Sequence, residues 1–425
     1  MTDTASADPA VIAAYPAGAY HRARGTVRHL AGVLACNAAI PALRISLERD
    51  AGQRARRLRA EAADRLEQRR RPTRKRMRAL VARPGARFAW HDVPAPPPPG
   101  PGAAIVHPIA VATCDLDRAM GLGRTPFPLP MCFGHECVAE VIETGDDVRT
   151  VRPGDRVVVP FQINCGDCRA CRAGLTANCT GVPPISMYGF GLAGGHWGGA
   201  LADLLAVPYA DAMLVPLPGG VDPAAAASVA DNVSDGYRNV AAHLPALLER
   251  DPGMPVLILG ELGHRLPLSS SVPLYAGLVA KALGAQKIHF ADRRPHLQRH
   301  AGELGFHPHA TVRGLPPAPF VIDGTCTSRG LATALHHTAP DGVCTTPGVL
   351  RRTARIPTAL MYGRNISYHL GRTHARAVIP HVLGLMRQGE LHPETVTTHH
   401  AKLDDAPAAI HDHVVGEATK TVLTE

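Results

Sequence analysis

Residues 256–292 read VLILGELGHRLPLSSSVPLYAGLVAKALGAQKIHFAD, and this stretch decides the class of the fold. Its first four residues are wholly apolar, as expected for a strand buried on both faces of a parallel sheet. Residues 273–284 have a helical composition, with Pro273 at the start and Gly284 as the stop signal. KIHFAD is then typical of the next strand. The order strand, helix, strand predicts a parallel sheet covered by helices.

The alternation continues toward the C-terminus. PHLQRHAGELG at 295–305 is typical of a second helix, and FVIDG at 320–324 is typical of a third strand. This βαβαβ order predicts an open, doubly wound α/β sheet, which we place at residues 236–375. From about residue 374 the sequence HARAVIPHVLGLMRQGEL predicts a helix, and the later TKTVLT predicts a short strand.

Residues 77–235 are expected to be mostly β-structure with long loops. Short runs rich in β-branched residues are separated by turn signals, and these runs are MRALV, AIVHPIAV, CVAEVIETG and DRVVVPF. The proline-rich segment at 94–102 is interpreted as a rigid turn between two strands, with a ligand for a polyproline-binding module as the alternative.

The first 76 residues differ from the rest in charge. They hold 16 Lys and Arg against 7 Asp and Glu, whereas the other residues hold 29 of each. We interpret 1–76 as a basic extension in which residues 42–71 form a solvated helix or are disordered. LAGVLAC at 30–36 offers a second interpretation, a signal followed by a lipidated Cys36, but its apolar stretch is shorter than a signal needs.

Overall composition excludes several classes of protein. Hydrophobic residues make up 45% and charged residues 19% of the 425 residues, which indicates a globular chain of two or three domains. No apolar run reaches the roughly 18–20 residues that span a bilayer. Aromatic residues make up only 4%, so a base-stacking surface and a specific nucleic-acid partner are not expected.

Four of the ten cysteines form one compact motif, C-x2-C-x2-C-x7-C. The motif consists of Cys165, Cys168, Cys171 and Cys179. Four thiolates can surround one tetrahedral zinc ion, and a site without an open position is structural. An iron–sulfur cluster is the competing interpretation. Reduced thiols that serve as metal ligands favour a cytoplasmic location.

A second set of metal-ligating residues is dispersed along the chain. Cys114 lies in ATCDLD, and His135 lies in FGHECVAEV at the start of a predicted strand. A thiolate and an imidazole both suit zinc, but a catalytic zinc ion needs three protein ligands and one open position. These two residues alone are equally compatible with ordinary core or loop positions.

Together these motifs resemble the zinc-dependent medium-chain dehydrogenases, a family that includes alcohol, threonine, sorbitol and formaldehyde dehydrogenases. The resemblance is carried by C-x-x-D at 114–117, GHE at 134–136, V-x-P-G-D-R-V at 151–157 and the four-cysteine segment. It extends over about residues 77–425. The motifs are specific for the family but not for a substrate.

The resemblance implies a two-domain architecture. A β-rich, GroES-like catalytic domain would be formed by residues 77–235 and 376–425, interrupted by a Rossmann domain at 236–375. The active site would lie in the cleft between them, outside the carboxyl ends of the parallel strands.

The resemblance also implies a catalytic zinc site. Cys114 and His135 would be ligands, and the third would be Asp231 in VADNVSDGYRNV, where the formaldehyde and threonine branches can carry an acid. Without the resemblance, Asp231 is more simply a helix cap. Asp117 is expected to accept a hydrogen bond from His135 and fix its tautomer. Glu136 is expected beside the metal and could bind it transiently.

The dinucleotide half departs further from the family. Gly260 and Gly263 remain from the glycine-rich turn that lets backbone approach a pyrophosphate, but the loop is several residues longer and Pro273 replaces a small residue. Serines at 269–271, Ser271 in particular, could cap the following helix and offer hydroxyls to a phosphate.

Two charged residues complete the predicted cofactor site. Asp292 closes the second strand, and a carboxylate there favours the ribose hydroxyls of NAD. Neighbouring Arg293 and Arg294 leave NADP as a less favoured alternative. Lys420 matches a position where the family often has a basic residue near the pyrophosphate; the alternative is an ordinary surface lysine.

One departure concerns proton transfer. The family usually has Ser or Thr two residues after the first zinc cysteine, whereas this chain has Leu116. Ser234, Asp115, His196 or water could take over that role.

The sequence therefore predicts an NAD(P)-dependent zinc alcohol dehydrogenase. It would hold two zinc ions per chain, one catalytic and one structural, and act on a small alcohol, polyol or aldehyde hydrate. A cytoplasmic dimer or tetramer is expected. Two alternatives remain: a zinc-bearing relative with a degenerate dinucleotide loop that binds partners or serves structure, and an enzyme tethered to nucleic acid or an anionic membrane by its basic extension.

Overall fold

The computed structural model describes residues 76–125, 127–263, 267–348 and 353–425. The predictions for the basic extension, including the helix at 42–71 and the lipidated Cys36, fall outside these ranges. No helix within the described ranges has the length and apolar character needed to cross a bilayer.

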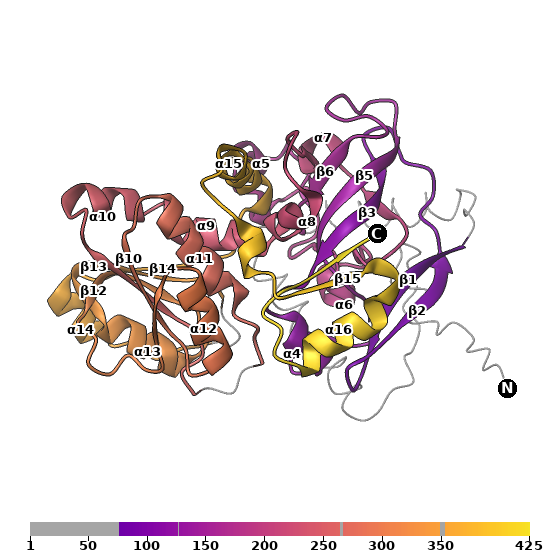
Figure 1. The fold of residues 1–425 in the computed structure, drawn as a ribbon. Coiled ribbons are helices and arrows are strands. Elements are labelled where there is room, and N and C mark those ends of the chain that lie inside the picture. The colour runs from indigo at the N-terminus through magenta and orange to yellow at the C-terminus, as the bar shows by residue number, and fades with distance from the viewer. Residues whose placement is uncertain (1–75, 126, 264–266, 349–352) are drawn as a thin grey trace.

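The predicted catalytic part is built on a seven-stranded sheet in the order β15-β16-β3-β5-β6-β8, with β7 paired to β3. Its strands are β3 (Ala104–Ala112), β5 (Glu136–Thr144), β6 (Arg156–Val159), β7 (Leu205–Val207), β8 (Val215–Pro216), β15 (His399–Lys402) and β16 (Thr421–Thr424). The C-terminal strand β16 runs antiparallel beside β3, so the chain returns to this sheet after leaving it, as Figure 1 shows.

A smaller sheet and several short helices complete the catalytic part. The sheet has the order β2-β1-β4 and consists of β1 (Arg76–Arg83), β2 (Arg87–Pro94) and β4 (Met131–Cys132). The α-helices are α4 (Asp117–Gly121), α5 (Arg169–Arg172), α6 (Gly191–Gly194), α7 (Ala210–Met213), α8 (Pro223–Ala226) and α16 (Ala406–Val415). The 3-10 helices are η1 (Thr176–Asn178), η2 (Ala227–Ala230), η3 (Pro393–Val396) and η4 (Leu403–Asp405).

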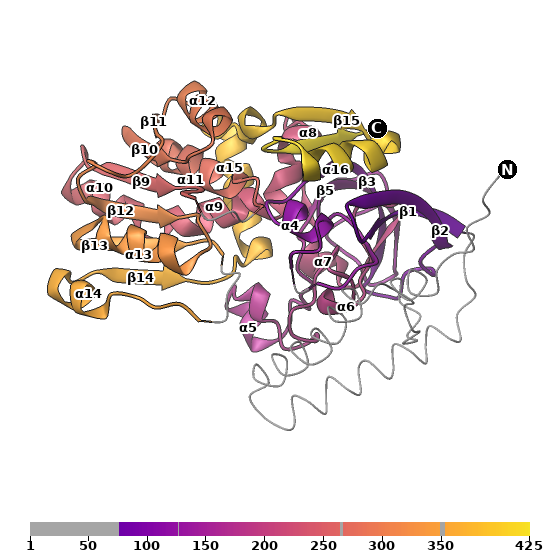
Figure 2. The same ribbon diagram turned by 90° about the horizontal axis from the view of Figure 1, so that it is seen from below.

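The second sheet is the predicted doubly wound sheet, with the order β11-β10-β9-β12-β13-β14, visible in Figure 2. All of its ladders are parallel. Its strands are β9 (Pro255–Leu259), β10 (Lys287–Ala291), β11 (His307–His309), β12 (Ala318–Asp323), β13 (Thr338–Thr346) and β14 (Ser367–Leu370). The order reverses between β9 and β12, and such a switch point is where open α/β sheets bind ligands.

Apart from the first, which precedes β9, the helices of this part connect parallel strands. They are α10 (Leu244–Arg250), α11 (Ser271–Ala282), α12 (Pro295–Glu303), α13 (Ser328–His336) and α14 (Thr358–Arg364). The helices and strands predicted between 256 and 324 are confirmed. Helix α11 begins at Ser271 rather than Pro273, because the missing N–H of a proline is tolerated in the first turn of a helix.

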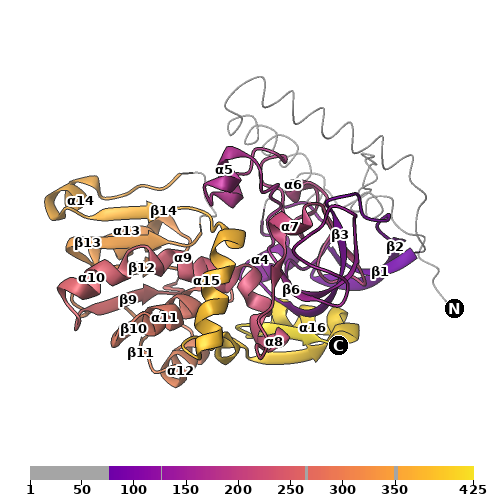
Figure 3. The same cartoon turned by 90° about the horizontal axis from the view of Figure 1, so that it is seen from above.

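Helices α9 (Asn232–Ala241) and α15 (Ala375–Gln388) lie between the two sheets in Figures 1 and 3. Helix α9 packs against both α11 and α15. A Cβ atom on Gly236 would lie 2.9 Å from the backbone nitrogen of Ala276, so the glycine permits the close approach of α9 to α11. The predicted boundary between residues 235 and 236 falls inside α9, which joins the two parts.

Candidate active site and zinc centres

The four predicted structural cysteines lie together around α5 and η1. The Sγ atoms of Cys168 and Cys179 are 4.0 Å apart. Several backbone N–H groups point at the sulfur atoms. They are those of Cys165 on Cys179 at 3.3 Å, Cys168 on Cys165 at 3.4 Å, Cys171 on Cys168 at 3.5 Å, Thr180 on Cys168 at 3.4 Å and Gly181 on Cys179 at 3.3 Å.

This arrangement fits a tetrahedral zinc ion. Zinc–sulfur bonds of about 2.3 Å place tetrahedral ligands roughly 3.8 Å apart, close to the observed sulfur separation. Burial would raise the pKa of the Cys168 thiol, but the N–H groups of Thr180 and Cys171 outweigh it and lower the pKa to about 6. Burial raises the pKa of Cys171 and of Cys179, and a divalent cation reverses such an effect.

The second cluster brings together Cys114, His135, Glu136 and Asp231, whose ligand atoms all lie within 4.8 Å of one another. Cys114 follows β3, His135 precedes β5, and Asp231 lies between η2 and α9. Asp231 Oδ2 is 3.5 Å from Cys114 Sγ and 3.4 Å from His135 Nε2. Three segments far apart in the sequence therefore converge at one point.

The donor atoms of this cluster fit a metal ion. Bonds of about 2.0–2.3 Å from zinc to N, O and S imply donor separations of roughly 3.3–3.8 Å, and both measured separations fall there. His135 is 2% exposed, and neither of its ring nitrogens has a hydrogen-bond partner among the described residues. Buried polar atoms left unpaired are costly, and a cation would satisfy one of them.

The structure does not support the capping interpretation of Asp231. The residue stands at the N-cap position of α9, but its side chain makes no capping hydrogen bond. Instead, the Nδ2 amide of Asn232 donates toward Asp231 Oδ2 at 3.2 Å and Cys114 Sγ at 3.3 Å. Asn232 thus orients two of the proposed zinc ligands.

Asp117 is buried beside the cluster in a different role from the one predicted. Its Oδ2 accepts the backbone N–H of Cys114 at 2.8 Å, which fixes the loop that carries the cysteine. Within the described chain, no hydrogen bond joins Asp117 Oδ1 or His135 Nδ1 to a partner. Burial raises the pKa of the Asp117 carboxyl.

Lys420 lies against the zinc cluster. The side chain is fully buried, and its Nζ donates to Glu136 Oε2 at 2.7 Å and to Asn232 Oδ1 at 2.9 Å. It also lies 5.6 Å from the ring centroid of Tyr275. The amine expected near a pyrophosphate therefore contacts residues adjoining the zinc ligands, which also excludes the surface-lysine alternative.

The cofactor half places Gly260 against Asp292. A Cβ atom on Gly260 would lie 2.2 Å from Asp292 Oδ2, so glycine is required for the carboxylate to sit there. The Asp292 carboxylate is fully buried. It accepts hydrogen bonds from the Glu261 N–H at 2.8 Å and from the Arg294 guanidinium at 2.7 Å.

Gly263 and Ser271 occupy the two ends of the long loop. Gly263 has a φ of +105°, and a Cβ atom there would lie 2.5 Å from an Arg293 nitrogen. Ser271 is the first residue of α11. Its hydroxyl contacts Asp115 at 2.6 Å and Asn232 Oδ1 at 3.0 Å, so the predicted phosphate ligand faces a carboxylate.

Comparisons with known proteins bear on the fold and on the class of protein. Residues 100–219 match the family model of the alcohol dehydrogenase GroES-like domain. An alcohol dehydrogenase from Thermus sp. ATN1 superposes with a TM-score of 0.73 at 28% identity, over 82% of this chain and 99% of that one. The chain is therefore similar to zinc-type alcohol dehydrogenases over most of its length, as the sequence motifs predict.

Two further relatives of this dehydrogenase align over different lengths. A probable zinc-binding alcohol dehydrogenase of Mycobacterium tuberculosis is 29% identical over 78% of this chain and 83% of its own length. A glutathione-independent formaldehyde dehydrogenase of Pseudomonas aeruginosa is 34% identical over 48% of this chain and 49% of its own length. The dehydrogenase is an oxidoreductase with a GroES-like and a Rossmann-like part.

Aromatic rings surround the His135 side of the dehydrogenase's zinc cluster, and the sequence did not single them out. The ring centroid of His135 is 4.9 Å from that of Phe190 and 5.8 Å from that of Phe161. Phe127 packs edge-on against Phe190 at 4.9 Å. The sequence gives no periodic signal for these rings because they lie in loops of the catalytic part.

The candidates for proton transfer are mostly engaged elsewhere. Ser234 is fully buried and donates to the Val229 carbonyl at 2.7 Å. Asp115 accepts hydrogen bonds at the start of α11. His196 follows α6 with a φ of +62°. Leu116 is partly buried against the core, so the zinc cluster lacks a hydroxyl at that position.

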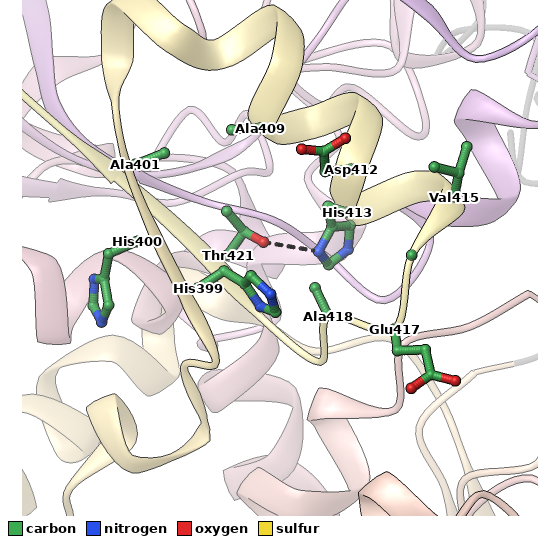
Figure 4. A pocket seen from close by; sticks show the side chains of 11 residues that line it. His399, His400, Ala401, Ala409, Asp412, His413, Val415, Glu417, Ala418 and Thr421 are labelled. Carbon is green, nitrogen blue, oxygen red and sulfur yellow. Dashed lines mark hydrogen bonds between the residues drawn. The ribbon is translucent and has the colours of Figure 1, made fainter.

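A separate hollow of about 460 Å³ lies beside β15 and α16 of the dehydrogenase (Figure 4). Its polar lining residues are His399, His400, Asp412, His413, Glu417 and Thr421. None of these residues belongs to the zinc cluster. The Nδ1 of His413 lies 3.1 Å from the hydroxyl of Thr421, which secures α16 to the C-terminal strand.

Proposed function

We propose that this dehydrogenase transfers a hydride between a small alcohol and NAD at a zinc ion held by Cys114, His135 and Asp231. A polyol or an aldehyde hydrate is included in this substrate class. The observation that carries the proposal is the convergence of Cys114 Sγ and buried His135 Nε2 on Asp231 Oδ2, at 3.5 Å and 3.4 Å. Neither ring nitrogen of His135 has a hydrogen-bond partner among the described residues.

Each residue of the cluster has a defined task in this proposal. Cys114, His135 and Asp231 would hold the metal and leave one position open to the substrate oxygen. When bound, zinc supplies Lewis-acid polarisation of that oxygen, and NAD supplies the hydride acceptor. Phe190 and Phe161 shield the His135 side from water. Because Leu116 has no hydroxyl, a proton from the substrate would leave through water.

The nucleotide part supports NAD more than NADP. Asp292 directly follows β10 and lies next to Gly260, at the edge where open α/β sheets bind a ribose. Its carboxylate repels the 2′-phosphate that distinguishes NADP. Arg293 and Arg294 act in the opposite direction, and the Arg294 charge is committed to Asp292. We therefore expect a higher kcat/KM with NAD than with NADP, and the reverse order would contradict this part of the proposal.

The four-cysteine cluster is assigned to a second, structural zinc ion. It offers four sulfur ligands and no open position, the arrangement of a site that stabilises a fold rather than catalyses. Its segment is anchored to the start of α15, because the Ala177 N–H donates to His374 Nδ1 at 3.1 Å. Loss of this metal would then disturb the region between the two sheets.

Location and assembly belong to the proposal as well. The four-cysteine cluster and Cys114, all free thiols, favour the reducing cytoplasm. The dimer or tetramer expected from the family resemblance is checked by light scattering coupled to size-exclusion chromatography. A monomer at micromolar concentration would contradict this expectation.

The proposed function is tested with a panel of alcohols and aldehydes and both nicotinamide cofactors, followed at 340 nm on zinc-loaded protein. We expect turnover of at least one member with NAD, abolished by chelation of zinc and by Cys114→Ser. The alternative, a zinc-bearing relative that serves as a binding or structural protein, predicts no binding of NADH. A titration that follows NADH fluorescence separates the two.

A further inference from the structure

Asp115 reaches from the catalytic part to the first turn of α11. It directly follows Cys114, in the loop after β3. Its Oδ1 accepts hydrogen bonds from the Ser269 hydroxyl at 2.8 Å and from both the N–H and the hydroxyl of Ser271 at 2.6 Å. Its Oδ2 accepts the Val272 N–H at 3.2 Å.

These four donors form a position suited to an anion. The first N–H groups of a helix have no partner within the helix, and the helix dipole adds positive potential there. Helix α11 has no cap of its own, because Ser270 at the N-cap has a φ of +66° and makes no capping side-chain bond. The Asp115 carboxylate takes over this role from the other part of the molecule.

The same position is where a dinucleotide would place its pyrophosphate. Helix α11 follows β9, the strand next to the switch point of the parallel sheet, and pyrophosphates bind at the N-terminus of the helix after that first strand. A carboxylate and a phosphate cannot accept the N–H groups of Ser271 and Val272 at the same time. One anion must leave before the other binds.

We propose that Asp115 is an intramolecular competitor of the dinucleotide, which occupies the anion position of α11 and sets the affinity for the cofactor. The inference rests on the proposed function for the identity of the ligand. In the free protein, Asp115 holds the two parts of the molecule together at this point. Binding of the cofactor requires its carboxylate to swing away from Ser271.

Replacement of the Asp115 carboxylate by a phosphate would also affect a residue beside the zinc cluster. The Ser271 hydroxyl has one proton and two acceptors, Asp115 at 2.6 Å and Asn232 Oδ1 at 3.0 Å. Asn232 in turn contacts Cys114 Sγ at 3.3 Å. When Asp115 leaves, the hydroxyl is released from the shorter bond and can donate to Asn232. Occupation of the nucleotide site is thereby transmitted to a residue that orients a zinc ligand.

The test compares Asp115→Asn with the wild-type protein, both loaded with zinc. Inorganic phosphate binding is measured by the broadening of its phosphorus NMR signal, and NADH binding by fluorescence. We expect Asp115→Asn to bind phosphate about tenfold more tightly, because the competing charge is gone. Equal or weaker phosphate binding by the variant would overturn the proposal.

A matched control is Asp222→Asn. Asp222 caps α8 through the Ala224 N–H at 3.1 Å, so this substitution neutralises a helix-capping carboxylate away from α11. We expect its phosphate and NADH affinities to equal those of the wild type. If Asp222→Asn gained phosphate affinity to the same degree as Asp115→Asn, the effect would be one of net charge and the proposal would be wrong.

The NADH arm separates this inference from the proposed function. Tighter phosphate binding with no NADH binding by either protein would support Asp115 as the occupant of an anion position at α11, and would contradict both the dinucleotide as its competitor and the dehydrogenase. If the variant does not fold, a crystal structure of the wild-type protein with bound NADH tests the same proposal. There we expect the Asp115 carboxylate to be beyond hydrogen-bond distance of the Ser271 nitrogen. Retention of that bond beside a bound pyrophosphate would refute the exchange.

Discussion

The Nζ atom of Lys420 lies 2.7 Å from Oε2 of Glu136, and neither side chain is exposed to solvent. The pair joins Lys420, which directly precedes the C-terminal strand β16, to Glu136, which directly follows the proposed zinc ligand His135. Burial alone would lower the pKa of Lys420, but the neighbouring Glu136 outweighs it and raises the pKa. Burial raises the pKa of Glu136 well above its ordinary value, and the contact with Lys420 opposes that rise.

Removal of one partner of this pair is expected to be strongly destabilising. Lys420→Met leaves Glu136 buried without its cation, which costs about 3–5 kcal/mol of unfolding free energy. The double variant with Glu136→Gln is expected to recover part of the loss. Urea denaturation measures both, and Lys402→Met on exposed β15 is the control. Equal stability of Lys420→Met and wild type would show that the pair contributes nothing.

Asp231 is expected to be irreplaceable by alanine. Asp231→Ala removes one of three protein ligands, so one zinc ion per chain should be lost and turnover should fall by orders of magnitude. Asp231→Cys is expected to restore metal binding, because thiolate also suits zinc. The control is Asp222→Ala, a capping residue, which should cost about 1 kcal/mol and retain both metals. Two zinc ions in Asp231→Ala would refute its assignment as a ligand.

Cys168 tests the structural zinc site independently. Cys168→Ser is expected to leave one zinc ion per chain by metal analysis and to lower the melting temperature, because the remaining three thiols no longer close the site. Cys326→Ser, which alters a cysteine outside both clusters, should retain two. Retention of both ions by Cys168→Ser would contradict the site.

His413 gives the protein a defined sensitivity to acid. Burial, followed by the nearby Arg118, Lys420 and His399, lowers the pKa of its imidazole to about 3. An unfolded histidine has a pKa of about 6.5, so between these values the unfolded chain binds more protons than the native one. The stability contributed by His413 is complete above pH 6.5 and falls on acidification, by about 1.4 kcal/mol per pH unit.

A variant isolates this contribution. His413→Gln is expected to lose unfolding free energy less steeply than the wild type between pH 6.5 and pH 4.5, measured by urea denaturation at each pH. His400→Gln changes an exposed residue and should have the wild-type slope. Identical slopes in all three proteins would show that His413 titrates normally.

The sequence predicted the parallel sheet well and its surroundings less well. Strand β9 is a continuous apolar run and β12 contains the apolar run FVI, so the local sequence shows that both are buried. Strand β10 is apolar at Ile288, Phe290 and Ala291. Strand β2 (Arg87–Pro94) was not predicted, because it is an edge strand whose exposed positions carry polar residues. Edge strands have weaker hydrophobic patterns than buried ones.

Roles that depend on long-range contacts could not be derived from spacing. Lys420 lies 284 residues from Glu136, and nothing in the local sequence shows which carboxylate it meets. Asp115 was considered only as a proton carrier, because its partners in α11 lie more than 150 residues away. The zinc site formed by the cysteines at 165–179 could be predicted from spacing, since all four ligands lie within one turn-rich segment.

The measurement that tests the central claim most directly is transfer of deuterium to NAD. Zinc-loaded protein is incubated with NAD and a panel of alcohols deuterated at the carbinol carbon, and the reduced cofactor is examined by mass spectrometry. We expect label in the NADH formed by the wild type from at least one alcohol, and none with Asp231→Ala. Absence of label from every alcohol, or equal label with Asp231→Ala, would contradict hydride transfer at a zinc ion held by Cys114, His135 and Asp231.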